Sequence, residues 1–174
     1  MKLSIVVALG SLLLVPAAKS FAQDITDPQI AAIVVTANQV DVEAGKLAKS
    51  KGSNKEIKAF AEQMITDHTG VNKQAGELVA KLKVKPEENA TSKGIKDGGD
   101  KNLANLKGLS GAAFDKAYID HEVAYHQTVL DAVDKVLIPG AKNEELKALL
   151  VKVRPAFEAH LAHAKMVQGS LGTM

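Results

Sequence analysis

The chain has 174 residues, among them 22 Lys or Arg, 20 Asp or Glu, five His and no Cys. The lack of cysteine excludes thiol catalysis, thiolate metal sites and disulfides, and a chain of this length forms one domain with a sizeable core. Few aromatic residues and many Ala, Leu, Val and Lys favour helices. Basic residues do not gather on a face with interleaved aromatics, so we expect no nucleic-acid partner.

Residues 1–22 have the pattern of a secretory signal peptide: Lys2, an apolar run over residues 3–15, and the small residues Ser20 and Ala22. The apolar run is shorter than the ~20 residues that a membrane-spanning helix needs, although an uncleaved anchor is the alternative. We predict cleavage after Ala22 and a soluble, exported domain over residues 23–174 with no transmembrane span. The removed segment holds Lys2 and Lys19 and no acid, so the mature domain is near neutral.

Two helices are predicted in the first half of this domain. Asp27 is a candidate N-cap for a helix that runs to about Lys49. Ser53, with Glu56 three residues later, predicts a capping box at the start of the second helix. In both helices the apolar residues recur at the i, i+3, i+4, i+7 spacing of one buried face.

The second half begins with a polar, glycine-rich stretch. Residues 84–111 read as a long connection with a weak helix near 102–107. A third helix is predicted over about 112–137, followed by a short turn. A fourth is predicted over about 143–170, with a kink at Pro155, whose ring removes a helical hydrogen bond.

The lengths of the three connections predict the topology. A short, a long and a short connection join the helices as two antiparallel pairs with a crossover between them. This is the ferritin-like arrangement of a bundle. We therefore predict an all-α, ferritin-like four-helix bundle with a long crossover between helices two and three, forming a single domain.

Five polar residues fall inside the apolar arcs when each helix is turned by ~100° per residue; they are Asp41, His68, Glu122, His126 and His160. A charge buried alone is costly, so such groups are expected to be paired or bound to metal. Imidazole nitrogens and carboxylate oxygens suit zinc, iron, copper or manganese. We predict a site for one transition-metal ion, and the alternative is a hydrogen-bonded polar network without metal.

Other polar residues lie at the edges of these arcs. His121 and His163 are expected at the surface or in support of the central groups. Glu43 points to the side of its helix. The sequence leaves open whether Asp41 or Glu43 is the acid that the first helix contributes. Asp67 is expected to face outward or to support a neighbouring imidazole.

Three segments carry a resemblance to a known family: "EIKAFAEQMITDHTGVN", "FDKAYIDHEVAYHQTVLD" and "PAFEAHLAHA". They resemble the signature of the bacterial domain of unknown function 4142 family, and the likeness extends over about residues 29–167. The resemblance implies an exported protein of the periplasm or outer envelope with a ferritin-like fold, often labelled a predicted outer-membrane protein. It implies no established activity.

The wider ferritin-like group binds two irons through one Glu from each of two helices and a Glu-x-x-His pair from each of the other two. Here Ile65 and Phe157 stand three residues before His68 and His160, where the bridging acids would be. A di-iron oxidase is therefore not expected.

The leading hypothesis is a non-enzymatic envelope protein whose bundle binds a transition metal and which could have a protein or envelope partner. One alternative is an oxidoreductase that handles peroxide or oxygen, and another is a metal-free scaffold or partner-binding bundle. The sequence has no G-x-S-x-G motif, so nucleophilic hydrolysis is not supported. It leaves the metal, any substrate and the oligomeric state open.

Overall fold

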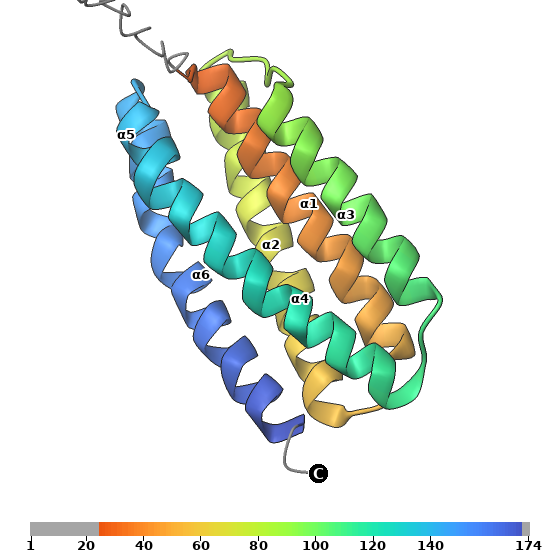
Figure 1. Cartoon of the computed structure of the whole chain (residues 1–174). Coiled ribbons are helices and arrows are strands. Elements are labelled where there is room, and N and C mark those ends of the chain that lie inside the picture. Colours follow the sequence, from red (N-terminus) through yellow and green to blue (C-terminus); the bar gives the residue numbers. More distant parts are fainter. Residues whose placement is uncertain (1–24, 172–174) are drawn as a thin grey trace, which may run out of the picture.

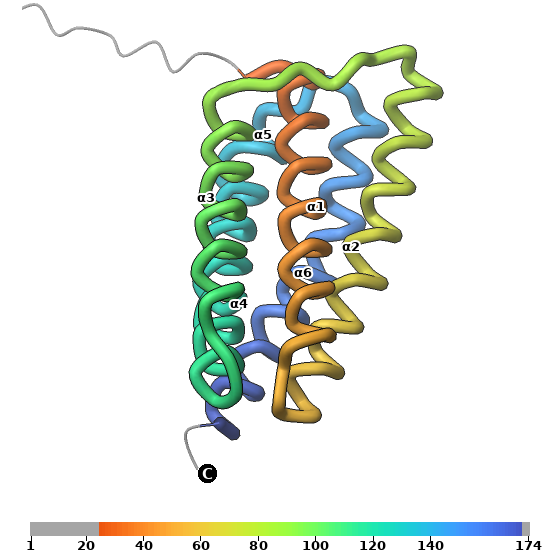
Figure 2. Tube along the Cα trace, turned by 90° about the vertical axis from the view of Figure 1, so that its right-hand side faces the viewer, coloured from red at the N-terminus to blue at the C-terminus, as the bar shows by residue number. Residues whose placement is uncertain are grey.

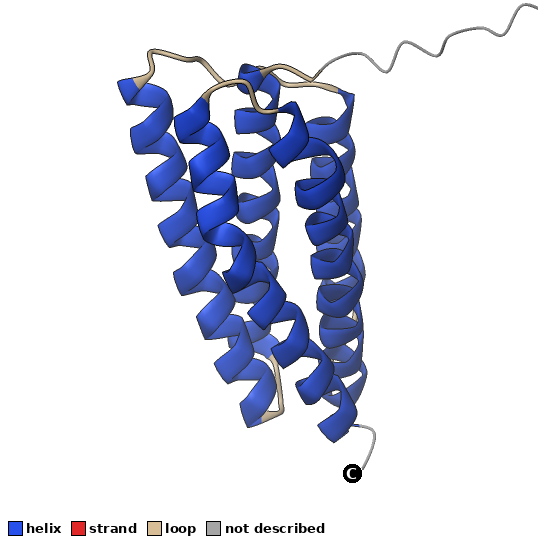
Figure 3. Ribbon diagram, turned by 90° about the vertical axis from the view of Figure 1, so that its left-hand side faces the viewer, coloured by secondary structure: helices blue, strands red, loops and turns tan. Residues whose placement is uncertain are grey.

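The computed structural model describes residues 25–171, so the predicted signal peptide lies outside the described residues. Every regular element of that part is helical, as Figure 3 shows by colour. The elements are α1 (Asp27–Lys51), α2 (Lys55–Lys81), α3 (Ala90–Lys107), α4 (Gly111–Ala132), the π-helical turn η1 (Val133–Leu137), α5 (Ile138–Gly140) and α6 (Glu144–Leu171). The predicted all-α class is confirmed.

Four long helices form the bundle, and a fifth lies outside it. α1 and α2 are an antiparallel pair, as are α4 and α6, while α2 packs on α6 and α1 on α4 (Figure 1). α3 runs along the outside against α1 and α4 and returns the chain from one end of the bundle to the other (Figure 2). The crossover between the two pairs is therefore as predicted, although it is itself a long helix.

The prediction of a mostly irregular connection with a short helix near 102–107 is wrong. α3 begins at the cap Asn89, whose side chain accepts from Ser92 N at 3.0 Å, and Ser92 Oγ accepts in return from Asn89 N. Gly99 lies so close to α1 that a Cβ there would be 2.6 Å from Val40 Cγ1. Packing on α1 thus outweighs the low helix propensity of this glycine-rich segment.

The predicted cap of α1 is also wrong, for a tertiary reason. Thr26 is the N-cap and accepts from Gln29 N. Asp27 instead reaches across the molecule, where its carboxylate accepts from Lys142 N at 2.8 Å and Asn143 N at 2.9 Å. The first helix therefore caps the turn that leads into α6.

At the start of α2 the predicted Ser53 capping box is absent. Asn54 is the N-cap, and its side chain accepts from Glu56 N at 2.7 Å. Ser53 N donates to the buried carboxylate of Asp115 in α4 at 2.9 Å, and Asn54 N donates to the same group at 2.8 Å. A distant acid thus satisfies backbone donors that a local cap was expected to satisfy.

The third predicted helix continues beyond its expected end. After α4 the chain makes the π-helical turn η1, in which Ile138 N donates to Val133 O, and then the short α5. α6 starts after Asn143, as expected, and continues through Pro155 without a break.

Among residues 25–171, none of the helices combines the length and the hydropathy that a membrane span requires.

The core has two apolar clusters, one towards each end of the bundle. The first includes Ile30, Val71, Leu130 and Leu150, and the second includes Ala48, Ile57, Phe114 and Val167. On α1, α2 and α4 the predicted inward-facing polar residues lie between residues of the two clusters. On α6, His160 lies between Phe157 and Leu161 of the first cluster, one turn before Ala164 of the second. The fold therefore holds a polar layer at mid-height inside an otherwise apolar core.

Candidate metal centre

The polar layer contains all five residues singled out from the sequence. Their exposed fractions are 1% for Asp41, 3% for His68 and 1% each for Glu122, His126 and His160. They come from α1, α2, α4 and α6, so each bundle helix contributes. Because Glu43 is exposed, Asp41 is the acid that α1 directs inward.

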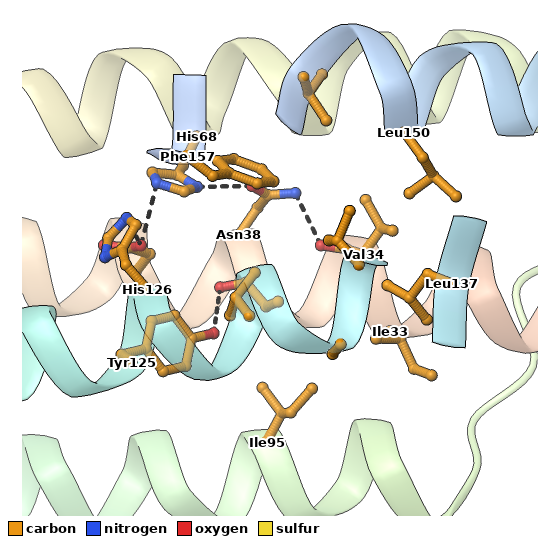
Figure 4. A pocket seen from close by; sticks show the side chains of 16 residues that line it. Ile33, Val34, Asn38, His68, Ile95, Tyr125, His126, Leu137, Leu150 and Phe157 are labelled. Atoms are coloured by element: carbon orange, nitrogen blue, oxygen red, sulfur yellow. Dashed lines mark hydrogen bonds and ion pairs between the residues drawn. The ribbon is translucent and has the colours of Figure 1, made fainter. Parts of the chain in front are cut away.

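The three imidazoles converge on one point. One ring nitrogen from each of His68, His126 and His160 lies within 4.8 Å of the corresponding nitrogens of the other two. Asp41 Oδ2 is 3.1 Å from His68 Nε2 and 3.5 Å from His126 Nε2. The close-up in Figure 4 shows His68 and His126 facing each other across this point.

The outward nitrogen of His68 has a defined partner, Asn38, in α1. Asn38 Nδ2 donates to Val34 O at 2.8 Å, which turns Asn38 Oδ1 towards His68 Nδ1 at 2.7 Å (Figure 4). An amide oxygen only accepts, so His68 Nδ1 carries the proton. His68 Nε2 is then left with a lone pair that points at Asp41.

The other two rings follow the same rule. His126 Nδ1 lies 3.0 Å from the carbonyl oxygen of Glu122, which can only accept. His160 Nε2 lies 2.9 Å from a carboxylate oxygen of Asp67. Each ring therefore donates its outer N–H, and His126 Nε2 and His160 Nδ1 keep lone pairs. Outer acceptors of this kind orient the histidine ligands of metal sites.

The inner atoms, by contrast, have no hydrogen-bond partner. His68 Nε2, His126 Nε2, His160 Nδ1 and both carboxylate oxygens of Asp41 are buried and unsatisfied. Buried polar groups in proteins are normally paired, so five such atoms on four neighbouring side chains require an explanation.

Burial sets the protonation of the layer. It lowers the pKa of His126 to about 4 and the pKa of His68 well below its usual value, with the neighbouring imidazoles lowering both further. It also lowers the pKa of His160, although the bond to Asp67 opposes this. At neutral pH the rings are therefore neutral, which is the form that binds metals.

The two acids respond in the opposite direction. Burial raises the pKa of Asp41 to about 7, and the neighbouring carboxyl group of Glu122 opposes the rise. Burial, then the charge of Asp41, raises the pKa of Glu122 well above its usual value. Burial thus favours the uncharged form of both carboxyl groups.

Glu122 lies differently from the other four predicted residues. Its Oε2 is 3.4 Å from His126 Nδ1, the outer nitrogen of that ring. Asp41, Glu122 and His126 form a second group of potential ligands, which shares only His126 with the group of three imidazoles. Asp41, unlike Glu122, also lies 3.1 Å from the inner nitrogen of His68. Glu122 is therefore placed to hold the side chains of Asp41 and His126 in position.

Asn38 was not predicted from the sequence, although it is only 2% exposed. It lies three residues before Asp41 on the same inward side of α1, and this spacing could have identified it as a buried polar residue. Asp67 supports an imidazole, one of its two expected roles. His121 stacks on Tyr125 and His163 bonds to Gln63 Oε1 at 2.9 Å; neither belongs to the central group.

The residue in place of one missing di-iron acid packs against the cluster. The ring of Phe157 stacks on His68, with centroids 5.2 Å apart and planes 4° from parallel. An apolar ring thus fills the space of a carboxylate that would bridge two irons.

The fold and the site together define an all-helical bundle with a buried group of His, Asp and Glu side chains that could hold a metal ion. The chain belongs to the family described as a domain of unknown function, DUF4142, whose family model matches residues 14–167. The resemblance noted in the sequence is thereby confirmed. No curated protein and no solved structure matches the chain.

Proposed function

We propose that the bundle binds one transition-metal ion through the inner nitrogens of His68, His126 and His160 and the carboxylate of Asp41. The observation that carries this proposal is the direction of the three imidazoles. Each ring donates its outer N–H to an acceptor, so each keeps a buried, unpaired lone pair on its other nitrogen. The three imidazoles lie within ligand distance of one another, and Asp41 Oδ2 lies next to the inner nitrogens of His68 and His126. Three histidines and one carboxylate are a common donor set for a first-row metal ion.

A metal-free hydrogen-bond network explains the same atoms less well. Protonated Asp41 could donate to one inner nitrogen, 3.1 Å away on His68. One proton on Asp41 serves one nitrogen, so the inner nitrogens of His126 and His160 would stay unsatisfied. Unsatisfied buried acceptors cost ~1–3 kcal/mol each, and one ion would remove this cost at every position.

The donor set narrows the metals predicted from the sequence. Imidazole suits zinc, copper and iron, whereas manganese prefers oxygen ligands. Zinc, copper and iron are therefore favoured over manganese. A bound ion would supply Lewis acidity, and iron or copper would add one-electron redox chemistry. Asn38, Asp67 and Glu122 would orient the ligands, and the apolar clusters would keep bulk water away.

The test is metal analysis of protein purified without a histidine tag, from a host grown with zinc, iron and copper. We expect about one ion per chain in the wild type. His68→Ala and His160→Ala should abolish retention, whereas His121→Ala and His163→Ala should retain the ion. The last two variants are matched controls because these histidines lie outside the central group.

A different result would refute the proposal. If reconstituted wild-type protein holds far less than one ion per chain, and its melting temperature does not change on adding any of the three metals, the layer is a structural network. The chain would then be a metal-free scaffold or partner-binding bundle.

We also propose that the protein acts in the periplasm or outer envelope, which is supported by the signal-like pattern of residues 1–22. Expression of the full chain in a Gram-negative host, followed by cell fractionation and N-terminal sequencing, tests this. We expect envelope fractions to contain a protein that begins at Gln23. Cytoplasmic protein that retains residues 1–22 would refute the location and leave the metal proposal untouched.

A further inference from the structure

A small, partly open cavity lies beside the polar layer, on the side of the first apolar cluster. Its volume is about 40 Å³, and one end of it is formed by Asp41, His68 and His126. The rest of the wall is almost wholly aliphatic and includes Ile33, Val34, Val129, Val133, Leu137 and Leu150 (Figure 4). The proposed metal centre therefore borders an apolar space.

Two polar residues on this wall, Tyr125 and Asn38, already have hydrogen-bond partners. Tyr125 Oη donates to Ala37 O at 2.9 Å, and the Asn38 amide bonds to Val34 O and His68. The inner atoms of Asp41, His68 and His126 are unpaired, but the surface that the cavity wall exposes is wholly apolar. A water molecule in the cavity would therefore not reach the two to four partners that it needs. Cavities of this kind remain dry and bind apolar guests.

Two elements outside the regular bundle helices, η1 and α3, form part of the cavity wall. Val133 and Leu137, on its wall, begin and end the π-helical turn η1, and π-helical turns are frequent at functional sites. Ile95 is the residue of α3 on the wall, so the outer helix closes the space with one side chain. The residues around an unfilled cavity lose packing contacts, which lowers the stability of the fold. A function of the cavity would explain why the fold keeps it.

We infer that this cavity holds an apolar diatomic gas, dioxygen, next to the metal centre. A volume of 40 Å³, against ~10–15 Å³ for one water, admits a molecule of two heavy atoms and excludes larger substrates. Hydrogen peroxide is also small, but it needs hydrogen-bond partners that the wall does not offer. The inference rests on the proposed function for the metal, whereas the cavity is present in the protein without it.

Methyl NMR of the mature protein, both metal-free and zinc-loaded, provides the test. Under xenon pressure we expect saturable shifts of methyl groups at Val129, Val133 and Leu137. Under dioxygen pressure the paramagnetic gas should relax the same methyl groups most strongly. Methyl groups of Ile57 and Val167, in the other cluster, serve as the reference.

A pair of matched variants locates the guest. Val133→Ile adds a methylene at the wall of the cavity, while Val71→Ile adds one to the same apolar cluster away from the wall. We expect Val133→Ile to weaken xenon binding about tenfold, the effect of one methylene in a close-fitting apolar pocket. Val71→Ile should bind xenon as the wild type does.

Equal weakening by both variants, uniform shifts throughout the protein, or an ordered water in the cavity would overturn the inference. The two proposals fail separately. Metal retention without gas binding would overturn only the cavity, and gas binding without metal retention would refute the metal centre while leaving the gas site.

Discussion

Replacement of Asn38 by leucine tests how the structure prepares His68 to bind a metal. Asn38 Oδ1 accepts from His68 Nδ1 at 2.7 Å, and both side chains are buried. Leucine has a similar size but accepts no hydrogen bond. In Asn38→Leu the imidazole loses the partner that fixes both its tautomer and its orientation, while every proposed ligand remains.

The expected effect has two parts. Loss of an outer partner lowers metal affinity by 10–100-fold in comparable sites, which is about 1.4 to 2.7 kcal/mol. The metal-free protein should lose about 1–3 kcal/mol of unfolding free energy, because His68 Nδ1–H becomes a buried donor without an acceptor. Affinity can be measured by competition with a chromophoric chelator for zinc and cobalt, and stability by urea denaturation.

Asn72→Leu is the matched control. Asn72 Nδ2 also donates to a carbonyl of α1, that of Val35 at 3.3 Å, but it does not belong to the ligand group. It should reduce stability modestly and leave metal affinity unchanged. If Asn38→Leu binds zinc as tightly as the wild type, or if the two variants weaken binding equally, the tautomer argument is wrong.

Three further predictions concern stability and packing. Burial lowers the pKa of His126 from 6.5 to about 4 in the folded protein. As the pH falls, His126 is therefore protonated in the unfolded chain before it is protonated in the folded protein, and the stability present above pH 6.5 is lost as the pH falls towards 4. At pH 5 the metal-free wild type should have lost about 2 kcal/mol more than His126→Gln, as urea titrations at pH 7 and 5 would show; parallel losses would contradict this. Asp115→Asn should cost about 1–3 kcal/mol in urea denaturation, because the carboxylate accepts two backbone N–H groups at the start of α2; an unchanged midpoint would refute that role. Gly99→Ala should speed hydrogen exchange in α3, since its Cβ would lie 2.6 Å from Val40 Cγ1, whereas Gly98→Ala, with open space at that position, should slow it; similar exchange in both variants would show that this contact does not hold α3.

The four bundle helices and their inward residues were predictable from the sequence, because helical periodicity is a local property. The spacing of apolar residues around Asp41, His68, Glu122, His126 and His160 was enough to show that all five face the core, and all five are buried. Which nitrogen of each ring faces the centre was not predictable. It depends on acceptors such as Asn38 and Asp67, which come from other helices.

The tertiary structure alone decided the remaining features. α3 is helical because Gly99 allows close packing on Val40, and a single-sequence propensity contains no such contact. Asp27 and Asp115 cap distant segments because helix ends far apart in the chain meet in space. The cavity next to His126 exists because side chains from several helices fail to fill one volume. The pattern of the chain thus determines which residues turn inward, and packing between helices determines what they meet there.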